Sequence, residues 1–319
     1  MRQQEKYDWM VYVSCMTFNH APYIVDAMNG FTMQETNFPF VCTIVDDAST
    51  DGEQEIIKQY LNEHFDLEDK NVVRQEETDD YVLTFARHKT NLNCYFAVFF
   101  LRYNHYSIKK SKVPYTSQWR DKAKYIAICE GDDFWVDKRK LQIQYDFLRK
   151  HSDYTMVFTA INLLFSDGRQ EQEHRYRHDN DSCDVRDCIL LGGGYLKLAS
   201  MMFVRGKEEY FSWIRNSPVG DCPMALSLFS RGKVMYMDRV TATYRVNAVG
   251  SWTQSNYSSF RKKFKHNKVA SQMWKSFDRF SDYKYHKIIK RKLLTNYFNL
   301  FPTPIKLIGY SFIKCFYSL

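Results

Sequence analysis

Strand-like and helix-like segments alternate along the first half of this chain. Runs of β-branched and aliphatic residues predict strands at residues 10–16, 40–45, 71–75, 125–129 and 155–165. Segments of helical period predict helices at residues 22–34, 52–63 and 137–151. Strands that alternate with helices build a parallel sheet with helices on both faces. We therefore predict an α/β fold with a mixed, mainly parallel sheet covered by helices.

The region between these segments, residues 76–124, shows neither period, and we expect it to be irregular. It contains an aromatic-rich stretch, YFAVFFLRYNHY, at residues 95–106. Such a stretch more often fills a core than lines a cofactor pocket. With 319 residues, of which 45% are hydrophobic, the chain can bury one large core or two smaller ones.

The predicted strand at 125–129 runs directly into Glu130, Gly131, Asp132 and Asp133. The carboxyl ends of buried parallel strands are where open α/β sheets hold their ligands. Adjacent aspartates repel each other, and a turn does not require two of them, so the pair indicates a cation site. A solvated turn is the alternative.

Polar residues also follow the first two predicted strands. Ser49 or Thr50 can cap the helix that follows the second strand, but capping does not explain Asp47. A carboxylate there can accept the imide N–H of a uracil or similar base, and Phe18 after the first strand offers a stacking face. No GxGxxG fingerprint and no GxxxxGK[ST] loop is present, which disfavours dinucleotide and P-loop sites.

The net charge of +8 is unevenly distributed. Residues 253–319 contain 14 Lys and Arg against 2 Asp and Glu, so this tail carries +12 and the preceding residues carry −4. Its mixture of cations and aromatic residues suits either an interfacial segment on an anionic membrane or a solvated helix that packs an aromatic stripe on the domain. No nucleic-acid partner is expected, because no recognised binding module accompanies the charge.

The chain starts with the charged sequence MRQQEKYD and contains no run of about twenty apolar residues. We therefore expect a cytoplasmic protein, which would be peripheral on the inner face of the cytoplasmic membrane if the tail is interfacial. The eight cysteines lack the spacing of zinc or redox motifs, and we expect them to be reduced and structural.

Several ordered segments resemble the family 2 glycosyltransferases, whose nucleotide-sugar-binding fold is called GT-A. They are VYVSCMTFNHAPYIVDAMNGFTMQ, TIVDDASTDG, YIAICEGDDFWVDKRKLQIQYDFL and, further on, SPVGDCPMALSLFSRGKVMYMDRVTATYRVNAVGSW. Together they span roughly residues 10–252. The resemblance implies a GT-A domain at residues 1–252, followed by a basic, aromatic, mainly helical extension at 253–319.

The resemblance also implies roles for individual residues. A nucleotide-sugar donor, with a UDP-sugar favoured, would be held by Thr17, Phe18, Asn19, Asp47, Asp132 and Arg245. A Mg²⁺ or Mn²⁺ ion would be bound by Asp133, with Asp132 as a further ligand or nearer the ribose. Phe134 and Trp135 would either wall the sugar pocket or pack in the core.

Asp221 precedes a predicted helix that starts at about residue 223, and by its position alone it is an N-cap residue. The resemblance instead implies a general base that deprotonates the acceptor hydroxyl and gives inversion in a single displacement. The triple glycine at 192–194 would form a permissive turn near the acceptor site.

Two positions near the end of the matched region bear on catalysis. Arg245 could face the diphosphate or form a structural salt bridge. Asn247 stands where related sequences often carry a histidine, which the family sometimes uses to contact metal or diphosphate.

The resemblance thus implies an inverting glycosyltransferase of hexosyl or N-acetylhexosaminyl type that acts on a glycan or lipid-linked acceptor in surface polysaccharide synthesis. The alternative is a non-catalytic scaffold of the same fold that binds nucleotide sugar or membrane.

Overall fold

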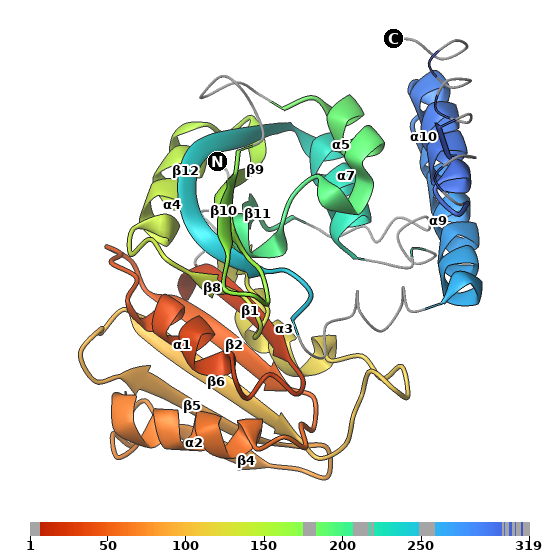
Figure 1. The fold of residues 1–319 in the computed structure, drawn as a ribbon. Coiled ribbons are helices and arrows are strands. Elements are labelled where there is room, and N and C mark those ends of the chain that lie inside the picture. Colours follow the sequence, from red (N-terminus) through yellow and green to blue (C-terminus); the bar gives the residue numbers. More distant parts are fainter. Residues whose placement is uncertain are drawn as a thin grey trace. The chain divides into compact units, whose positions relative to one another are not determined.

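The fold is that of a computed structural model, which describes residues 7–174, 183–206, 217, 220–248, 259–301, 303, 306, 307, 310 and 314. The chain divides into two compact units (Figure 1). The first comprises Met1–Asp181, Leu198–Gly206 and Met235–Gly250, and the second comprises Ser182–Lys197, Lys207–Val234 and Ser251–Leu319. The second unit therefore includes two segments that precede the boundary at residue 252 expected from the sequence.

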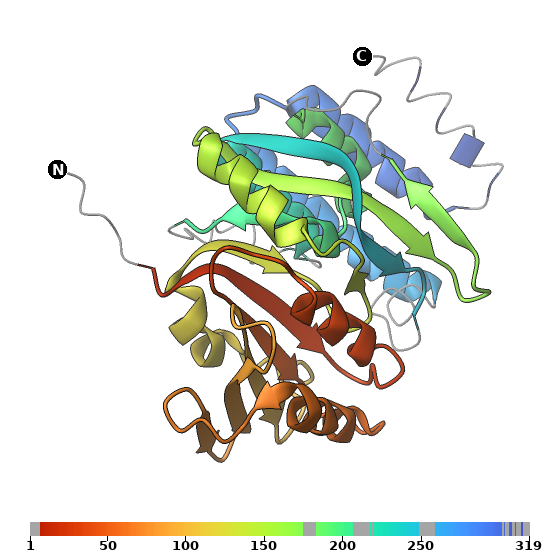
Figure 2. The same ribbon diagram turned by 90° about the vertical axis from the view of Figure 1, so that its left-hand side faces the viewer.

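The first unit is built on one sheet with the strand order β3-β5-β6-β2-β1-β7-β11-β9-β12-β8, with β4 paired to β5 and β10 paired to β9. Its strands are β1 (Trp9–Thr17), β2 (Phe40–Asp46), β3 (Phe65–Asp66), β4 (Arg74–Glu77), β5 (Tyr81–His88), β6 (Cys94–Leu101), β7 (Ala123–Ile128), β8 (Phe134–Trp135), β9 (Tyr154–Leu164), β10 (Gln170–Glu173), β11 (Met202–Val204) and β12 (Lys233–Arg245). The neighbours β6, β2, β1 and β7 are parallel. The flanking pairs, including the β9–β10 hairpin in Figure 2, are antiparallel. The prediction of a mixed sheet is confirmed, but only its centre is parallel.

Four α-helices belong to the first unit where the structure describes it, and they pack on the sheet or on its edges. They are α1 (Ile24–Thr32), α2 (Glu53–His64), α3 (Val113–Arg120) and α4 (Lys140–Lys150). Val11 and Val13 of β1 belong to the same buried cluster as Met28 and Phe31 of α1. Helix α3 contacts β1, β2 and β7. Every residue of β2 is buried, as expected of a strand covered on both faces.

The prediction that residues 76–124 are irregular is wrong. This region contains β5, β6 and α3, and β6 pairs in parallel with β2 on the side opposite β1. The strand near 71–75 lies instead at Arg74–Glu77, antiparallel to β5. Strand β6 is buried at nearly every position, so it lacks the alternation that identifies a half-exposed strand. Its buried phenylalanines, Phe96 and Phe99, confirm that this part of the aromatic stretch is core.

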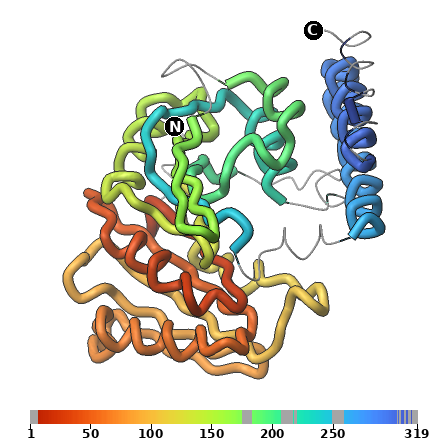
Figure 3. Tube along the Cα trace, viewed as in Figure 1, coloured from red at the N-terminus to blue at the C-terminus, as the bar shows by residue number. Residues whose placement is uncertain are grey.

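The second unit consists of helices in its described part: α5 (Val185–Leu191), the short η1 (Gly192–Gly194), α7 (Asp221–Arg231), α9 (Phe260–Phe280) and α10 (His286–Phe298). Helix α5 contacts α7 and α10, and α10 contacts α9, which lies beside it in Figure 3. The aromatic residues of α9 divide into two groups. Trp274 and Phe277 are buried, whereas Phe260, Phe264 and Phe280 are exposed. Part of the expected aromatic stripe is therefore core.

Within the described ranges, none of the helices is both long and apolar enough to cross a bilayer. The cysteines in those ranges are free: Cys15, Cys42, Cys94, Cys129, Cys183, Cys188 and Cys222.

Candidate functional site

The carboxyl ends of three parallel strands meet at one edge of the sheet in the first unit. Strand β1 lies between β2 and β7, and its C-terminal residues are hydrogen-bonded to the loops that follow both neighbours. The backbone N–H of Asp47 donates to the Thr17 carbonyl at 3.0 Å, and that of Gly131 donates to the Met16 carbonyl at 3.1 Å. The three acidic or polar strand ends found in the sequence are therefore adjacent, at the edge where α/β sheets hold ligands.

Glu53, at the start of α2, joins the first two of these strand ends. It is fully buried, and its carboxylate accepts hydrogen bonds from the Thr17 hydroxyl, the His20 backbone N–H at 2.9 Å and the Ser49 hydroxyl at 2.8 Å. Burial raises the pKa of Glu53, and the Thr17 hydrogen bond partly offsets this. Sequence reasoning missed this residue, because an acid in the first turn of a helix is usually a solvated group that favours the helix dipole.

Residues 17–19 have different environments. The Thr17 hydroxyl is used by Glu53, and Asn19, in a left-handed conformation with φ 57°, accepts from the Thr50 N–H through Oδ1 at 2.8 Å. Thr17 and Asn19 thus hold the loops together. Phe18 is 39% exposed, so its ring is accessible for stacking.

Asp47 is buried, and its carboxylate is hydrogen-bonded to the segment that follows β6. Its Oδ1 accepts from the His105 N–H at 2.8 Å, and its Oδ2 accepts from the Tyr106 N–H at 3.1 Å and pairs with the Lys112 ammonium at 2.9 Å. These contacts give Asp47 a structural role that the sequence did not reveal. A carboxylate oxygen has more than one lone pair, so an N–H of a bound base could share these oxygens.

The Asp132–Asp133 pair follows β7. Asp133 is buried, and its Oδ1 accepts from the Arg245 backbone N–H at 2.9 Å. Burial, together with the neighbouring negative charge of Asp132, raises the pKa of Asp133 well above its usual range. The Asp132 Oδ2 lies 3.9 Å from His20 Nε2. Two neighbouring carboxylates thus lie in one loop, and the charge of Arg245 only partly offsets the raised pKa of Asp133.

Gly131 allows this loop to approach β1. A Cβ atom at residue 131 would lie 2.2 Å from the Thr17 hydroxyl oxygen and 3.2 Å from His20 Nδ1. Such distances are not tolerated, so any larger residue would displace the loop that carries Asp132 and Asp133.

Arg245 braces the same loop. Its guanidinium donates to the Asp132 carbonyl at 2.7 Å and pairs with Asp26. It also lies 4.8 Å from the ring centroid of Tyr23 and 4.6 Å from that of Phe134. The salt bridge that the sequence offered as an alternative is present.

Trp135 belongs to the core rather than to a pocket wall. Its side chain is buried, its Nε1 donates to the Ala199 carbonyl at 3.0 Å, and its ring centroid lies 4.9 Å from that of Phe31. A Cβ at Gly30 would lie 2.8 Å from the backbone nitrogen of Trp135, so α1 and β8 are in close contact.

The chemistry of Asp132 and Asp133 fits a divalent cation. Among the residues that the structure describes, no group of three or more His, Cys, Asp and Glu could hold a metal ion. Mg²⁺ and Mn²⁺ need fewer protein ligands than that, because one or two carboxylates suffice when water and phosphate oxygens complete the shell. A buried carboxylate beside a second one is a suitable donor set.

Asp221 belongs to the second unit, where it is the first residue of α7 and follows Gly220 at the N-cap. Its Oδ1 accepts from the Cys222 N–H at 2.7 Å. Burial raises the pKa of Asp221, and the charge of Lys197 partly offsets this. A Cβ at Gly193 would lie 3.2 Å from the Asp221 Oδ2, so the triple glycine lies directly against this carboxylate.

Comparisons with known sequences find distant relatives. No protein-family profile matches the chain. It is 27% identical over 254 residues to uncharacterized proteins of Mycobacterium bovis and Mycobacterium tuberculosis. The matched region covers 77% of this chain but only 61% of theirs. It is also 26% identical over 259 residues to TuaG of Bacillus subtilis, a putative teichuronic acid biosynthesis glycosyltransferase. This match covers 76% of this chain and 83% of TuaG.

A solved structure shares the fold. The mannosyltransferase PcManGT from Pyrobaculum calidifontis, in complex with GDP-Man and Mn²⁺, matches with a TM-score of 0.50 and 13% sequence identity, over 99% of this chain and 78% of PcManGT. At this identity the match concerns the fold alone. The predicted resemblance to glycosyltransferases of the GT-A fold is confirmed by these comparisons.

Proposed function

We propose that this GT-A-fold chain is an inverting glycosyltransferase that depends on a divalent cation. It would transfer a hexosyl or N-acetylhexosaminyl group from a nucleotide sugar, with a UDP-sugar favoured, to a glycan or lipid-linked acceptor in surface polysaccharide synthesis. The similarity to TuaG supports the class of pathway.

The observation that carries this proposal is the convergence of three strand ends at one edge of the sheet. Asp47 after β2 and the Asp132–Asp133 pair after β7 flank the exposed Phe18 after β1. Backbone hydrogen bonds and the buried Glu53 hold these loops in place before any ligand binds. A preorganised edge of this kind suits a nucleotide, whose base can stack and whose diphosphate needs a cation.

In this proposal the residues of the first unit bind the donor. Phe18 stacks on the base, and Asp47 accepts the imide N–H while keeping the 104–112 segment in place. Asp133 and Asp132 hold Mg²⁺ or Mn²⁺. When bound, the ion supplies Lewis-acid stabilisation of the departing nucleoside diphosphate. Thr17, Asn19 and Arg245 contribute by positioning the loops, since their polar groups are used within the protein.

Asp221 is the general base in this proposal. Burial raises its pKa, which improves its basicity relative to an exposed aspartate. A base that removes the acceptor proton as the hydroxyl attacks the anomeric carbon gives inversion in one displacement. The adjacent Gly193 leaves space at the carboxylate for the acceptor hydroxyl.

One set of observations favours a non-catalytic scaffold of the same fold. The Asp47 carboxylate and the Arg245 guanidinium already have protein partners, and Asn247 stands in place of the histidine expected in related sequences. A scaffold would bind the nucleotide sugar without releasing nucleoside diphosphate.

The two functions are separated by incubating the purified chain with a panel of nucleotide sugars and Mn²⁺ and measuring nucleoside diphosphate release. The transferase proposal predicts slow release from one class of donor that stops in excess EDTA. Donor binding without release by any donor, with glycan acceptors added, supports the scaffold.

A further inference from the structure

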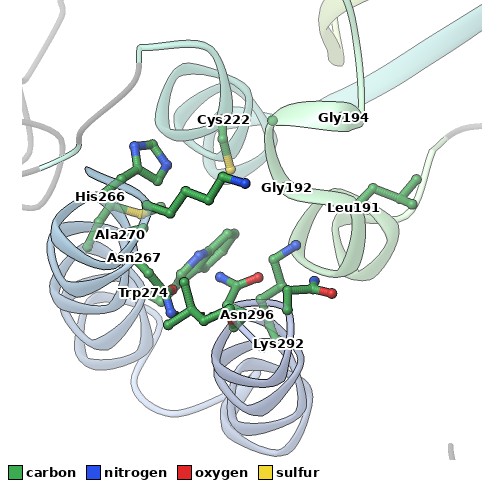
Figure 4. A pocket seen from close by; sticks show the side chains of 15 residues that line it. Leu191, Gly192, Gly194, Cys222, His266, Asn267, Ala270, Trp274, Lys292 and Asn296 are labelled. Atoms are coloured by element: carbon green, nitrogen blue, oxygen red, sulfur yellow. Dashed lines mark hydrogen bonds between the residues drawn. The ribbon is translucent and has the colours of Figure 1, made fainter. Parts of the chain in front are cut away.

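The second unit contains a cavity of about 450 Å³ beside Asp221 (Figure 4). It is lined by residues of α5, η1, α7, α9 and α10, so it lies wholly within this unit. Cys222, the neighbour of Asp221, and Gly193, whose Cβ would lie 3.2 Å from the Asp221 carboxylate, both line it. The proposed general base is therefore adjacent to the cavity.

The lining is cationic and rich in amides. It contains Lys263, Lys292, His266 and three asparagines, and among the described residues that line it there is no Asp or Glu. The buried Trp274 contributes an aromatic edge. Amide groups and an aromatic surface are suited to a sugar, whereas two lysines in the lining favour an anion.

Lys292 gives the strongest indication of an anionic ligand. It is only 9% exposed, and its ammonium donates one hydrogen bond, to the Leu190 carbonyl at 2.7 Å. Its nitrogen approaches Gly192 so closely that a Cβ there would lie 2.9 Å from it. Burial lowers the pKa of Lys292, and the nearby Cys222 and Cys188 only partly offset this; the described residues that line the cavity with Lys292 include no carboxylate. A buried lysine without a counter-ion either loses its proton or is stabilised in its charged form by an anion from outside the chain.

We propose that this cavity is the acceptor subsite and that it takes an acidic sugar, with the sugar ring among the asparagines and its phosphate or carboxylate on Lys292 and Lys263. The proposal rests on the proposed function, and it narrows the acceptor to an anionic glycan or a phosphate-linked sugar. The acidic group anchors the acceptor, so that a hydroxyl is presented to Asp221.

Binding to the full chain tests this directly, without donor or metal. Isothermal titration calorimetry with glucuronate, glucose 1-phosphate and glucose should show binding of one or both acids and none of neutral glucose. The preferred acid identifies the carboxylate or the phosphate as the ligand group. Lys263→Gln and Lys292→Gln should weaken binding about 10- to 100-fold, the effect of losing a hydrogen bond between charged groups.

Lys265→Gln is the matched control. Lys265 is exposed and lies in α9, as Lys263 does, but it does not line the cavity. This variant should bind as the wild type does. If Lys292→Gln does not fold, Lys263→Gln alone decides, because Lys263 is exposed at the rim. Equal binding of glucose and the acids, no binding of either acid, or undiminished binding by Lys263→Gln would overturn the proposal.

Failure here is distinguishable from failure of the proposed function. A chain that releases nucleoside diphosphate from a donor but ignores both acids refutes the acceptor subsite alone. A chain that binds an acid but neither binds nor cleaves any nucleotide sugar refutes the transferase.

Discussion

Gly131 is the residue on which the shape of the strand edge depends most. An added Cβ would collide with the Thr17 side chain and crowd His20. We predict that Gly131→Ala abolishes donor binding, because the Asp132–Asp133 loop must move away from β1. Donor affinity is measured by calorimetry, with thermal unfolding recorded in parallel.

Gly194→Ala is the matched control for this change. Its Cβ would meet no heavy atom within 4 Å. Gly194→Ala should keep the donor affinity of the wild type. If Gly131→Ala also keeps that affinity, the loop tolerates displacement and the prediction is wrong.

Asp221→Asn should separate base chemistry from donor binding. The asparagine can still accept the Cys222 N–H through its oxygen, so the start of α7 is retained. We predict a rate loss of about 10²- to 10⁴-fold with unchanged donor affinity. A loss of donor affinity equal to the rate loss would show that the residue is structural.

The wild-type pH profile adds an independent check on Asp221. Its pKa is raised by burial, and a general base acts only when deprotonated. Transfer should therefore fall as the pH is lowered through that raised pKa, at a pH above the ordinary aspartate value of about 4. A profile that stays flat to below pH 4 would exclude Asp221 as the base.

Residue-level reasoning from the sequence had a clear limit. Asp47, Asp132 and Asp133 stand out in the sequence because they follow apolar runs, whereas Asp221 was singled out by the family resemblance. The sequence could not show that Asp47 binds the backbone of His105, since that contact joins residues 58 apart. Nor could it show that Glu53 is buried, because its sequence position is typical of a solvated helix start.

At the scale of elements, α4 begins with a lysine that is buried against β8. The Lys140 ammonium donates to Gln144 Oε1 at 2.6 Å and lies 4.7 Å from the ring centroid of Trp135. Burial lowers the pKa of Lys140 to about 7. Between this pH and the unfolded pKa of about 10.4, the unfolded chain binds more protons than the folded one, so stability rises with pH.

We predict that Lys140→Met removes this dependence. The contribution of Lys140 to the free energy of unfolding should increase by about 2 kcal/mol from pH 7 to pH 9 in the wild type, and the increase should be missing in the variant. Urea denaturation at the two pH values measures it. Lys138→Met serves as control, since the Lys138 side chain is 62% exposed. A variant with the same pH dependence as the wild type would show that Lys140 stays protonated when folded.

The elements themselves were predictable to different degrees. Strands β1, β2 and β7 were found because short apolar runs end in polar turns. Strands β5 and β6 were missed, since β6 is a continuous buried run within an aromatic-rich stretch. The grouping of 182–197 and 207–234 with the C-terminal helices could not be predicted, because charge and composition change only near residue 252.

At the scale of the whole molecule, the start of α9 carries an exposed apolar and cationic surface. Phe260 is 60% exposed and Phe264 is 51% exposed, and the cations Arg261, Lys262, Lys263 and Lys265 lie between and beside them in the sequence. Cations at a helix N-terminus oppose the helix dipole, so these charges do not stabilise α9 through its dipole. An anionic membrane surface would attract these cations, since each nearby cation contributes about 1 kcal/mol to binding.

We predict that the full chain sediments with phosphatidylglycerol vesicles at low salt and is released by added salt. The double variant Phe260→Ser, Phe264→Ser should sediment less, whereas Tyr297→Ser, at an exposed position of α10, should not change binding. Absence of the full chain from the vesicle pellet at low salt would refute the membrane interpretation of the tail.

The central claim is that the strand edge formed by β1, β2 and β7 holds a nucleoside diphosphate through a cation on Asp133. The most direct measurement is calorimetric binding of the nucleoside diphosphate released in the donor panel, with Mn²⁺ and then with EDTA. The comparison uses the wild type, Asp133→Asn, and Asp167→Asn as an exposed control. The account predicts that affinity falls at least about tenfold in EDTA and in Asp133→Asn, the effect of losing a charged ligand interaction, and is unchanged in Asp167→Asn. Equal affinity with and without the cation, and in Asp133→Asn as in the wild type, would contradict it.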